Sequence, residues 1–546
     1  MQKYFITKNH RLIDIAFLLA ATISLQIYFL FDLGFYSDDW AFLGVLSNIK
    51  SSGLLTFIYD FFIIYKDILI TRPIQVIQLS SLYWFFDTSP LGYHISNLFF
   101  LSLLVIYFYL SLNKLNAPRI AAFTIPLIYT LLPHYSTTRM WVASFTINVS
   151  TCFFFINIYA NMKYIESLEK GKSSWQWLLT SLASLAISIL AYEVIVPLFV
   201  LNFLITWWKC RSKGLKCAGI ISLSVLIYLL CILFKVHYST RIGGYNSNYL
   251  ISITQAFKSA AINDFYTYGF KLPKHIWHLF QTRTSGNTYF IALSLSLIIF
   301  LYLIQFKIQA YTRRFWLLTI LSGAVIYLMG YSIFLTANNL SPTPTGINNR
   351  VTTAAAIGVS ACFFGSIGLA SFHIRNKNIK TFIFAFPVSV LCGSGYIANY
   401  AISTFFSRSY ISQLKILDSL QRRGPELTTK NTLILDGICP YVGPAPIFDC
   451  EWDLAGALQK IYKNTYIKAD VRTNRLSYNE KGLTTITYGK KNFYAYNQYL
   501  IIYNNQTEKY FILKNFEDAK AYFTTNLSSD ISTCAEGREG YGVNIF

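Results

Sequence analysis

Charged residues are scarce in this chain of 546 residues. Asp, Glu, Lys and Arg together make up 13% of it, whereas hydrophobic residues make up 54%. A soluble protein of this size carries about one-quarter charged residues, so the composition argues against an ordinary soluble enzyme. Apolar stretches of about 20 residues, the length that crosses a bilayer, recur along most of the sequence. We therefore expect a polytopic, all-α membrane domain.

Acidic residues are scarcer than basic ones. The sequence has 25 Asp and Glu against 46 Lys and Arg, which gives a net charge of +21. Such an excess can indicate nucleic-acid binding, but here the basic residues cluster in short loops between apolar runs, where they orient membrane helices. We therefore expect no nucleic-acid partner. The sequence also lacks a Gly-rich phosphate loop and a Walker motif.

The first apolar run lacks a small-residue cleavage site and is too long for the core of a signal peptide. We interpret residues 13–35 as an uncleaved membrane helix. Basic segments predict which loops are cytoplasmic; they are residues 3–11, 114–119, 163–172, 209–217, 307–314 and 373–380. With residues 13–35, about eleven membrane helices are expected; the others are 91–112, 119–133, 141–161, 176–190, 195–208, 218–236, 288–306, 315–336, 351–371 and 381–404.

The first outer loop, residues 36–90, contains two further apolar stretches. Residues 52–70 and 73–86 are expected to lie on the outer membrane surface as juxtamembrane helices. The alternative is a pair of additional spans, which would keep the topology but place Asp60, Lys66 and Asp67 in lipid at a cost of a few kcal/mol each.

An odd number of spans puts the N-terminus in the cytoplasm and the tail outside. We therefore divide the chain into a membrane domain, residues 1–404, and a soluble extracytoplasmic α/β domain, residues 405–546. Within the tail, "NTLILDG" and "AYFTTN" (521–526) suggest strands, and "EWDLAGALQKIY" (451–462) has helical spacing.

Cysteines agree with an outside tail. Cys439 and Cys450 bracket a turn-rich loop, and we predict a disulfide between them in an oxidising compartment. Cys210 and Cys217 flank a basic cytoplasmic loop and have no neighbouring partner ligands for zinc.

Several polar residues converge on the outer side in this topology. They are Asp38, Asp39, Arg72, His94, Asn97, His134, Arg139, Trp141, Glu193 and Arg350. Each has a bland interpretation as a solvated, capping or lipid-phosphate-binding residue. Glu193 is the exception, because an acid that borders hydrocarbon is costly without a partner or a water-filled cavity. Together, acids and arginines on one face suggest a cavity that handles a charged lipid head.

Glycosyl transfer from a polyprenyl-phosphate sugar suits such a cavity. A carboxylate can take the proton of an acceptor hydroxyl as that hydroxyl attacks the sugar. The leaving group is a phosphate, whose growing charge needs cations, and arginine binds phosphate oxygens bidentately. Trp40 and Trp141 can stack on a sugar ring or lie at the level of the lipid headgroups.

Five short motifs also occur in a recognisable order. They are "SDDW" (37–40), "TRPIQVIQLSSLYWFF" (71–86), "SPLGYHISN" (89–97), "LPHYSTTRMW" (132–141) and "AYEVIVPL" (191–198). This order resembles the GT-C superfamily of integral-membrane glycosyltransferases, and most closely its protein O-mannosyltransferase-like branch with many bacterial relatives. The resemblance covers about residues 30–200 and extends loosely to Arg350.

The resemblance implies roles for the converging residues. Asp38 or Asp39 would be the catalytic base. Arg350 would meet the carrier phosphate, with Arg72 nearby. The remaining residues would line the acceptor, sugar or carrier site; they are His94, Asn97, Arg139, Trp141 and Glu193.

Two departures from the family pattern matter. Relatives often have an acid after the His/Pro pair of the second outer turn, whereas "HYSTTR" has none. A divalent cation is therefore left open, since Asp38, Asp39 and Glu193 are few ligands for one. The tail also lacks tetratricopeptide periodicity, so acceptor recognition differs from that of the repeat-linked relatives.

The expected function is inverting transfer of a single hexose, such as glucose, from undecaprenyl phosphate to a surface glycan in the bacterial inner membrane. An Ile-, Lys- and Asn-rich composition fits an O-antigen modification gene, although a protein acceptor stays possible in principle. Two alternatives remain open. One is a transporter or flippase of lipid-linked glycans; the other is a polymerase, ligase or oligosaccharyltransferase that uses a diphosphate-linked glycan.

Overall fold

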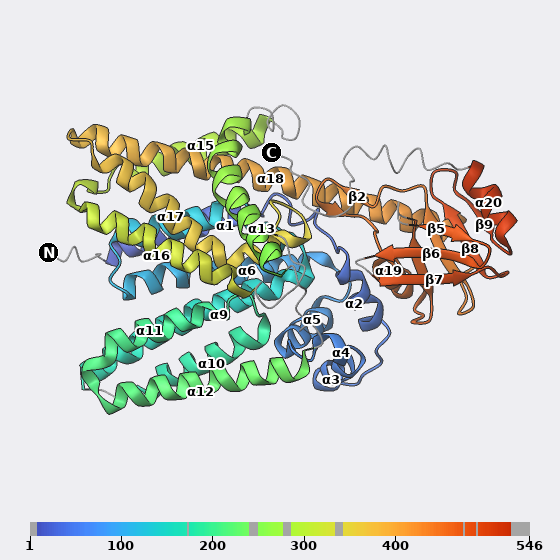
Figure 1. Ribbon diagram of the computed structural model, residues 1–546, viewed down its shortest axis with the longest axis horizontal. Coiled ribbons are helices and arrows are strands. Elements are labelled where there is room, and N and C mark those ends of the chain that lie inside the picture. Colours follow the sequence, from blue (N-terminus) through green and yellow to red (C-terminus); the bar gives the residue numbers. More distant parts are fainter. Residues whose placement is uncertain are drawn as a thin grey trace.

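The computed structural model describes residues 8–171, 174–239, 249–276, 286–333, 342–472, 476–487 and 490–525. A helical bundle forms most of the molecule, and a small α/β domain lies at one end of it (Figure 1). The expected fold class, a helical membrane domain followed by a domain that contains strands, is confirmed.

Each of the expected membrane segments overlaps a helix. The helices are α1 (Lys8–Ser24), α6 (Pro90–Lys114), α7 (Arg119–Leu131), α9 (Phe145–Glu169), α10 (Trp175–Ala191), α11 (Leu198–Cys210), α12 (Leu215–Tyr238), α15 (Gly286–Leu303), α16 (Arg313–Tyr331), α17 (Thr353–Phe372) and α18 (Lys377–Arg423). Within the described residues, 7 helices are long and apolar enough to cross a membrane. The number of spans therefore stays a prediction.

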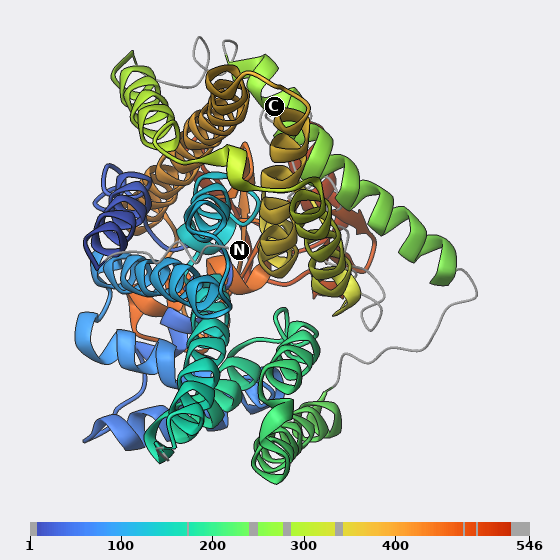
Figure 2. The same cartoon turned by 90° about the vertical axis from the view of Figure 1, so that its left-hand side faces the viewer.

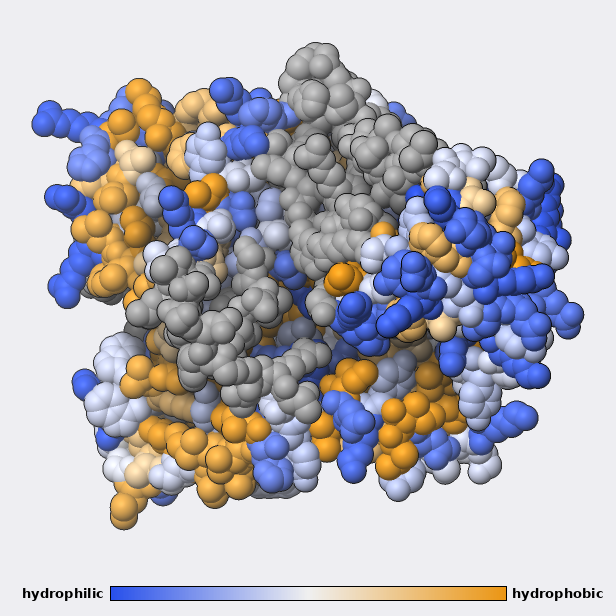
Figure 3. Space-filling view, turned by 45° about the vertical axis from the view of Figure 1, so that its right-hand side comes forward, coloured by the Kyte–Doolittle hydropathy of each residue, from blue (hydrophilic) through white to orange (hydrophobic). Residues whose placement is uncertain are grey.

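The outside of the bundle carries the exposed apolar side chains that a lipid-facing surface needs. Leu229, Leu230 and Leu233 on α12 are all exposed, and so are large apolar residues on α15 and α16. Figure 2 shows these helices around the rim of the bundle. In Figure 3, hydrophobic residues gather over the bundle and hydrophilic residues over the α/β domain. Because lipid does not penalise exposed apolar groups, this distribution fits a membrane-embedded bundle.

The first outer loop folds into four short helices between the bundle and the α/β domain (Figure 1). These are α2 (Asp38–Leu46), α3 (Leu54–Ile64), α4 (Lys66–Leu69) and α5 (Pro73–Phe86). With 11 and 14 residues, α3 and α5 are about 17 and 21 Å long. Because a bilayer core is about 30 Å thick, neither helix can span it upright, which favours the juxtamembrane interpretation.

The α/β domain has a four-stranded sheet in the order β4-β1-β8-β9. Strands β4, β1 and β8 run parallel, and β9 is antiparallel to β8. The remaining strands form a two-stranded and a three-stranded sheet. The elements are β1 (Thr432–Asp436), β2 (Tyr441–Val442), β3 (Ala445–Pro446), α19 (Glu451–Tyr462), β4 (Lys468–Val471), β5 (Ser477–Asn479), β6 (Gly482–Thr487), β7 (Lys490–Ala495), β8 (Leu500–Asn504), β9 (Lys509–Ile512) and α20 (Phe516–Thr525).

The sequence predicted β1 and α19 correctly, but the strand expected over 521–526 is wrong. Residues 516–525 form helix α20, which buries Ala519, Tyr522 and Phe523 against the sheet. Spacing of three and four residues between these apolar side chains is helical. Helix α18 continues through residue 404, where the domain boundary was expected, and ends only at Arg423. One unbroken helix therefore joins the bundle to the α/β domain.

The predicted disulfide between Cys439 and Cys450 is wrong. The Cys450 thiol is free and buried at the N-terminus of α19, whereas Cys439 is disulfide-bonded to a different cysteine. Among the described residues, Cys210 and Cys217 form a disulfide that the sequence analysis did not anticipate. The short turn η2 (Arg211–Lys213) brings their Cα atoms to 5.5 Å, within the range that a disulfide requires.

Candidate active site at the outer end of the bundle

The stretch that contains the acidic pair is fixed on both sides. The Tyr36 hydroxyl donates to the carbonyl of Phe406 at 2.9 Å, and the Trp40 indole donates to Gln413 at 2.7 Å. Both acceptors lie on α18. Between them, Ser37 has a positive φ of 48°, a conformation that costs a non-glycine residue about 1–3 kcal/mol. This turn starts helix α2, so that Asp38 and Asp39 occupy its first turn.

Asp39 is buried and held by the backbone. Its carboxylate accepts N–H groups from Tyr36 at 2.9 Å and from Ala143 at 2.6 Å. A third N–H comes from Val142 at 3.3 Å. Burial raises the pKa of Asp39 well above its usual range, and the N–H donors only partly oppose this. With both oxygens occupied inside the protein, Asp39 joins α2 to the second outer turn and has no access to a substrate hydroxyl.

Asp38 is the accessible member of the pair. It is half-buried, and its Oδ1 accepts a hydrogen bond from the Trp452 indole at 3.0 Å. Trp452 lies on α19, so the α/β domain contacts the acid directly. The first turn of a helix also favours a charged carboxylate, because the helix dipole is positive there. Of the two acids that the sequence offers as the base, Asp38 is therefore the accessible carboxylate.

Arg350 approaches the acidic pair through Trp141. Its guanidinium lies 4.9 Å from the Trp141 ring centroid, and the Trp141 indole donates to the carbonyl of Tyr36 at 2.8 Å. Arg350 also donates to the carbonyl of Ile347 at 3.1 Å. Over the described part of the chain no carboxylate forms an ion pair with it. A half-buried cation without an acidic partner is a candidate for binding an anion.

Arg72 and Glu193 form a second centre. The Arg72 guanidinium binds both carboxylate oxygens of Glu193, and Lys235 lies 3.4 Å from the same carboxylate. Although burial opposes the charge, these cations hold the pKa of Glu193 well below its usual range. Arg72 also lies over the ring of Tyr192 at 4.0 Å. With two cations and one acid, this centre has a net positive charge. The Arg72 guanidinium already binds Glu193, so fewer of its donors are left for a phosphate.

The Gly-x-His-x-x-Asn motif has a positioning role in the structure. The buried His94 ring bonds the carbonyl of Gly34 at 3.0 Å. The buried Asn97 amide donates to the carbonyls of Thr138 and Arg139 at 2.9 and 3.2 Å. A Cβ on Gly92 would lie 2.2 Å from the Phe86 ring. These residues hold the two outer loops together, and neither His94 nor Asn97 lies where a sugar could touch it.

Arg139 lies apart from the acidic pair. Its buried guanidinium donates to the carbonyl of Thr130 at 2.5 Å and lies 4.6 Å from the Tyr135 ring centroid. It faces a cavity of about 10 Å³ inside the bundle, which has room for about one water molecule and none for a sugar phosphate. Arg139 therefore supports the outer turn rather than the phosphate site.

A buried polar network beneath the second outer turn was not found from the sequence. Asn349 Oδ1 accepts the Ser136 hydroxyl at 3.1 Å and the Thr137 N–H at 3.3 Å. His134 Nε2 lies 3.1 Å from the carbonyl of Asp264, and the Tyr331 hydroxyl donates to the Asp264 carboxylate at 2.5 Å. His134 was among the polar residues that the sequence placed on this side, and Asn349 directly precedes Arg350 in "NNR", but nothing in the sequence joined them to Asp264. This network fixes the backbone from which Arg350 extends.

The acids expected near the site are poorly suited to a divalent cation. Glu193 is neutralised by two cations, and both oxygens of Asp39 accept backbone N–H groups. Of the three expected acids, Asp38 is then a single carboxylate, which is too few ligands for a divalent cation. Within the described ranges, one group could hold a metal ion: Asp449, Cys450 and Asp453. Its Asp453 oxygens accept backbone N–H groups of Asp449, Cys450 and Leu454 at the start of α19. These bonds are a helix cap, so we assign no metal there.

No protein-family model matches this chain, and no curated protein matches it. Among solved structures, it is similar to the crystal structure of ArnT from Cupriavidus metallidurans bound to undecaprenyl phosphate, with a TM-score of 0.36 and 11% identity over 85% of this chain and 90% of that chain. It is also similar to the apo state of the same protein, with a TM-score of 0.30 and 12% identity over 78% and 82%. Likeness at this level carries no functional argument, so the function is argued from the residues.

Proposed function

We propose that this chain is an inverting membrane glycosyltransferase of the GT-C type. It transfers a single sugar from a polyprenyl-phosphate carrier to an acceptor hydroxyl on the outer side of the membrane. The observation that carries the proposal is the chain of contacts from Arg350 through Trp141 to Tyr36, two residues before Asp38. These contacts connect Arg350, which has no ion-pair partner among the described residues, to the segment that carries the accessible acid. A cation and a base are the groups that a phosphate-leaving transfer needs.

Asp38 serves as the general base in this proposal. It takes the proton of the acceptor hydroxyl as the hydroxyl oxygen attacks the anomeric carbon, and the bond from that carbon to the phosphate oxygen breaks on the opposite face. The sugar is transferred with inversion, and the carrier leaves as polyprenyl phosphate. The bond from the Trp452 indole orients the Asp38 carboxylate, while Asp39 holds α2 against the second outer turn.

Arg350 binds the phosphate and stabilises the charge that grows on it as the bond breaks. The Trp141 ring and the bond to the carbonyl of Ile347 hold the guanidinium in place, and its remaining donors can bind the phosphate oxygens. The centre of Arg72, Lys235 and Glu193, with two cations and one acid, adds further positive potential. No metal ion takes part in this proposal.

The finer assignments rest on the sequence. We propose that the carrier is undecaprenyl phosphate, that the sugar is a hexose such as glucose, and that the acceptor is O-antigen or another surface polysaccharide. The enzyme then resides in a bacterial inner membrane, with the α/β domain in the periplasm. A flippase is disfavoured because the ion pair Lys114–Glu166 lies at the ends of α6 and α9 rather than along a central pathway.

The test is an assay of the full chain in lipid nanodiscs with polyprenyl-phosphate-[14C]glucose. We expect slow release of glucose to water in the absence of acceptor, and faster incorporation when surface polysaccharide from the cells that carry the gene is added. A mass shift of one hexose per modified repeat supports the proposal. Consumption of a diphosphate-linked oligosaccharide, with none of the monosaccharide carrier, contradicts it.

A further inference from the structure

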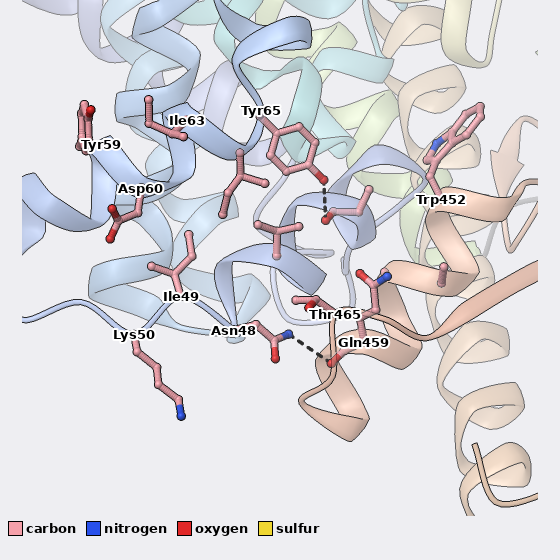
Figure 4. Close-up of a pocket in the computed structure, with 15 residues that line it drawn as sticks. Asn48, Ile49, Lys50, Tyr59, Asp60, Ile63, Tyr65, Trp452, Gln459 and Thr465 are labelled. Carbon is pink, nitrogen blue, oxygen red and sulfur yellow. Dashed lines mark hydrogen bonds between the residues drawn. The ribbon is translucent and has the colours of Figure 1, made fainter. Parts of the chain in front are cut away.

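A large open pocket lies between the first outer loop and the α/β domain. It has a volume of about 910 Å³, at the upper end of the range of ligand pockets, roughly 300–1,000 Å³. Figure 4 shows Tyr59, Asp60 and Ile63 of α3 on one side and Gln459 and Thr465 of the α/β domain on the other. Asn48 lies between them, whereas Ile49 and Lys50 lie on the side of Asp60 and Ile63. Asp38 itself is not among the residues that line this pocket.

Helix α2 forms the base of the pocket and is fixed against the α/β domain. Helices α2 and α19 meet at Gly44 and Gly456, where a Cβ on Gly44 would lie 2.7 Å from the carbonyl oxygen of Gly456. The Asn48 side chain donates to the carbonyl of Gly44 at 2.7 Å and lies 3.4 Å from the carbonyl of Gln459 (Figure 4). On the other side, the Tyr65 hydroxyl donates to the carbonyl of Ala41 on α2 at 2.9 Å. Close contact of this kind leaves little freedom at the base of the pocket, so the pocket exists before any ligand binds.

The chemistry of the lining suits a neutral glycan. Tyr59, Tyr65 and Trp452 supply aromatic rings, and isoleucines complete the apolar surface. Polar groups of both kinds lie among them: the Asp60 carboxylate accepts and the Lys50 ammonium donates. Over the described residues neither forms an ion pair. One positive and one negative charge cancel, which disfavours a phosphate. A sugar chain presents apolar ring faces and hydroxyls that both donate and accept, which matches this lining.

The pocket also leads to the proposed reaction centre. Trp452 belongs to its wall, and the same indole bonds the Asp38 carboxylate at 3.0 Å. A chain bound in the pocket therefore has one end close to the base. The volume suits several sugar rings rather than one, so a polymeric acceptor fits better than a single hydroxylated side chain.

We infer that this pocket binds the acceptor glycan, with α3 and α19 as its walls. This inference rests on the proposed function, and it adds a role for the α/β domain: the domain completes the acceptor site. An oligosaccharide lies against Tyr59 and Trp452, Asp60 and Lys50 bind its hydroxyls, and its reacting hydroxyl reaches Asp38.

Equilibrium binding tests the inference without requiring turnover. The probe is a fluorescently labelled oligosaccharide, cut from delipidated surface polysaccharide of the cells that carry the gene, and the protein is the full chain in nanodiscs. We expect Tyr59→Ala and Asp60→Asn each to raise the Kd about tenfold or more, which corresponds to about 1.4 kcal/mol. The Kd for polyprenyl phosphate is measured in parallel.

Matched substitutions outside the pocket provide controls. Asp67→Asn changes an exposed acid on α4, and Tyr510→Ala changes an exposed tyrosine on β9; neither residue lines the pocket. Both should bind the oligosaccharide and turn over the carrier like the wild type, and all four variants should unfold at similar temperatures.

Two outcomes for the oligosaccharide overturn the inference. One is that the wild type does not bind it; the other is that the pocket variants bind it with the same Kd as the wild type. Weaker binding of polyprenyl phosphate alone also overturns it, because the pocket would then hold the carrier. Release of glucose by the wild type without acceptor tests the proposed function separately.

Discussion

At the scale of single residues, the two neighbouring acids have different surroundings. Asp39 is enclosed by three backbone N–H groups, whereas Asp38 is half-buried and contacts Trp452. Two identical side chains next to each other in the first turn of a helix point in directions about 100° apart, so one can be structural while the other faces the site. The order of the letters alone does not say which is which.

Exchanging each acid for its amide should separate these roles. Asp38→Asn keeps the size of the side chain and removes the base, so we expect at least a hundredfold loss of glucose transfer with an unchanged melting temperature. Asp39→Asn places an N–H donor against backbone N–H groups. We therefore expect the free energy of unfolding to fall by roughly 1–3 kcal/mol, and the melting temperature to fall with it. Thermal unfolding and initial rates of both variants check this. Full activity of Asp38→Asn would remove it as the base.

Arg350 should respond differently to two substitutions. Arg350→Lys keeps the positive charge but loses the planar guanidinium and its stacking on Trp141. Arg350→Ala loses the charge as well. We therefore expect turnover to fall from the wild type to Arg350→Lys and further to Arg350→Ala. The KM for the carrier should rise in the same order. Arg408→Ala, an exposed arginine on α18, serves as the control. Equal KM values for the carrier in all four proteins would contradict the phosphate-binding role.

Asp264 should make stability depend on pH. Burial among Tyr331, Tyr327 and Tyr268 raises the pKa of its carboxyl to about 7. Because the folded pKa is higher than the unfolded value, the stabilisation is present in acid and is lost as the pH rises through about 7. Asp264→Asn cannot titrate, so we expect the difference in melting temperature between the wild type and this variant to fall from pH 5 to pH 8. A constant difference would show that the carboxyl does not titrate there.

At the scale of elements, the contact between α2 and α19 joins the two parts of the molecule. A Cβ on Gly456 would lie 2.3 Å from the carbonyl oxygen of Trp40 and 2.7 Å from the Cα of Ala41. Both are backbone atoms, which cannot rotate away. Helix α2 is therefore held in one position, because α19 packs on it with no side chain between the two backbones.

Gly456→Ala should therefore loosen this contact. Overpacking of a close helix crossing costs about 1–3 kcal/mol, so we expect faster proteolysis between the bundle and the α/β domain and a lower melting temperature. Gly219→Ala is the matched control, since it lies within α12 with open space around the position of a Cβ. Limited proteolysis of both variants in nanodiscs checks the prediction. Identical digestion patterns would show that α19 can shift at no cost.

At the scale of the whole molecule, one helix crosses from the bundle into the α/β domain. Helix α18 has 47 residues, about 70 Å, more than twice the thickness of a bilayer core. The α/β domain lies at one end of the bundle (Figure 1). From the positive-inside rule we predict that this end faces away from the cytoplasm.

Fusion reporters test this orientation. Alkaline phosphatase joined after residue 425 should be active, because it folds only outside the cytoplasm. Green fluorescent protein joined at the N-terminus should fluoresce, because it folds in the cytoplasm. Phosphatase joined within residues 307–312 is the control and should be inactive. The reverse pattern would place the site on the cytoplasmic face.

The sequence by itself determined the membrane class, the helix positions, the strand β1 and helix α19, because hydrophobic periodicity and loop charge are local properties of the chain. It also pointed to Asp38, Asp39 and Arg350, because polar residues at the ends of apolar runs are conspicuous. Only the tertiary structure decided that four of the candidate side chains form hydrogen bonds with backbone groups: Asp39, His94, Asn97 and Arg139. It also decided that Cys450 forms no disulfide and that residues 516–525 are a helix. Each of these depends on contacts between segments far apart in the chain. The pocket between α3 and α19 belongs to the same class, since its two walls are about 400 residues apart and neither wall alone indicates it.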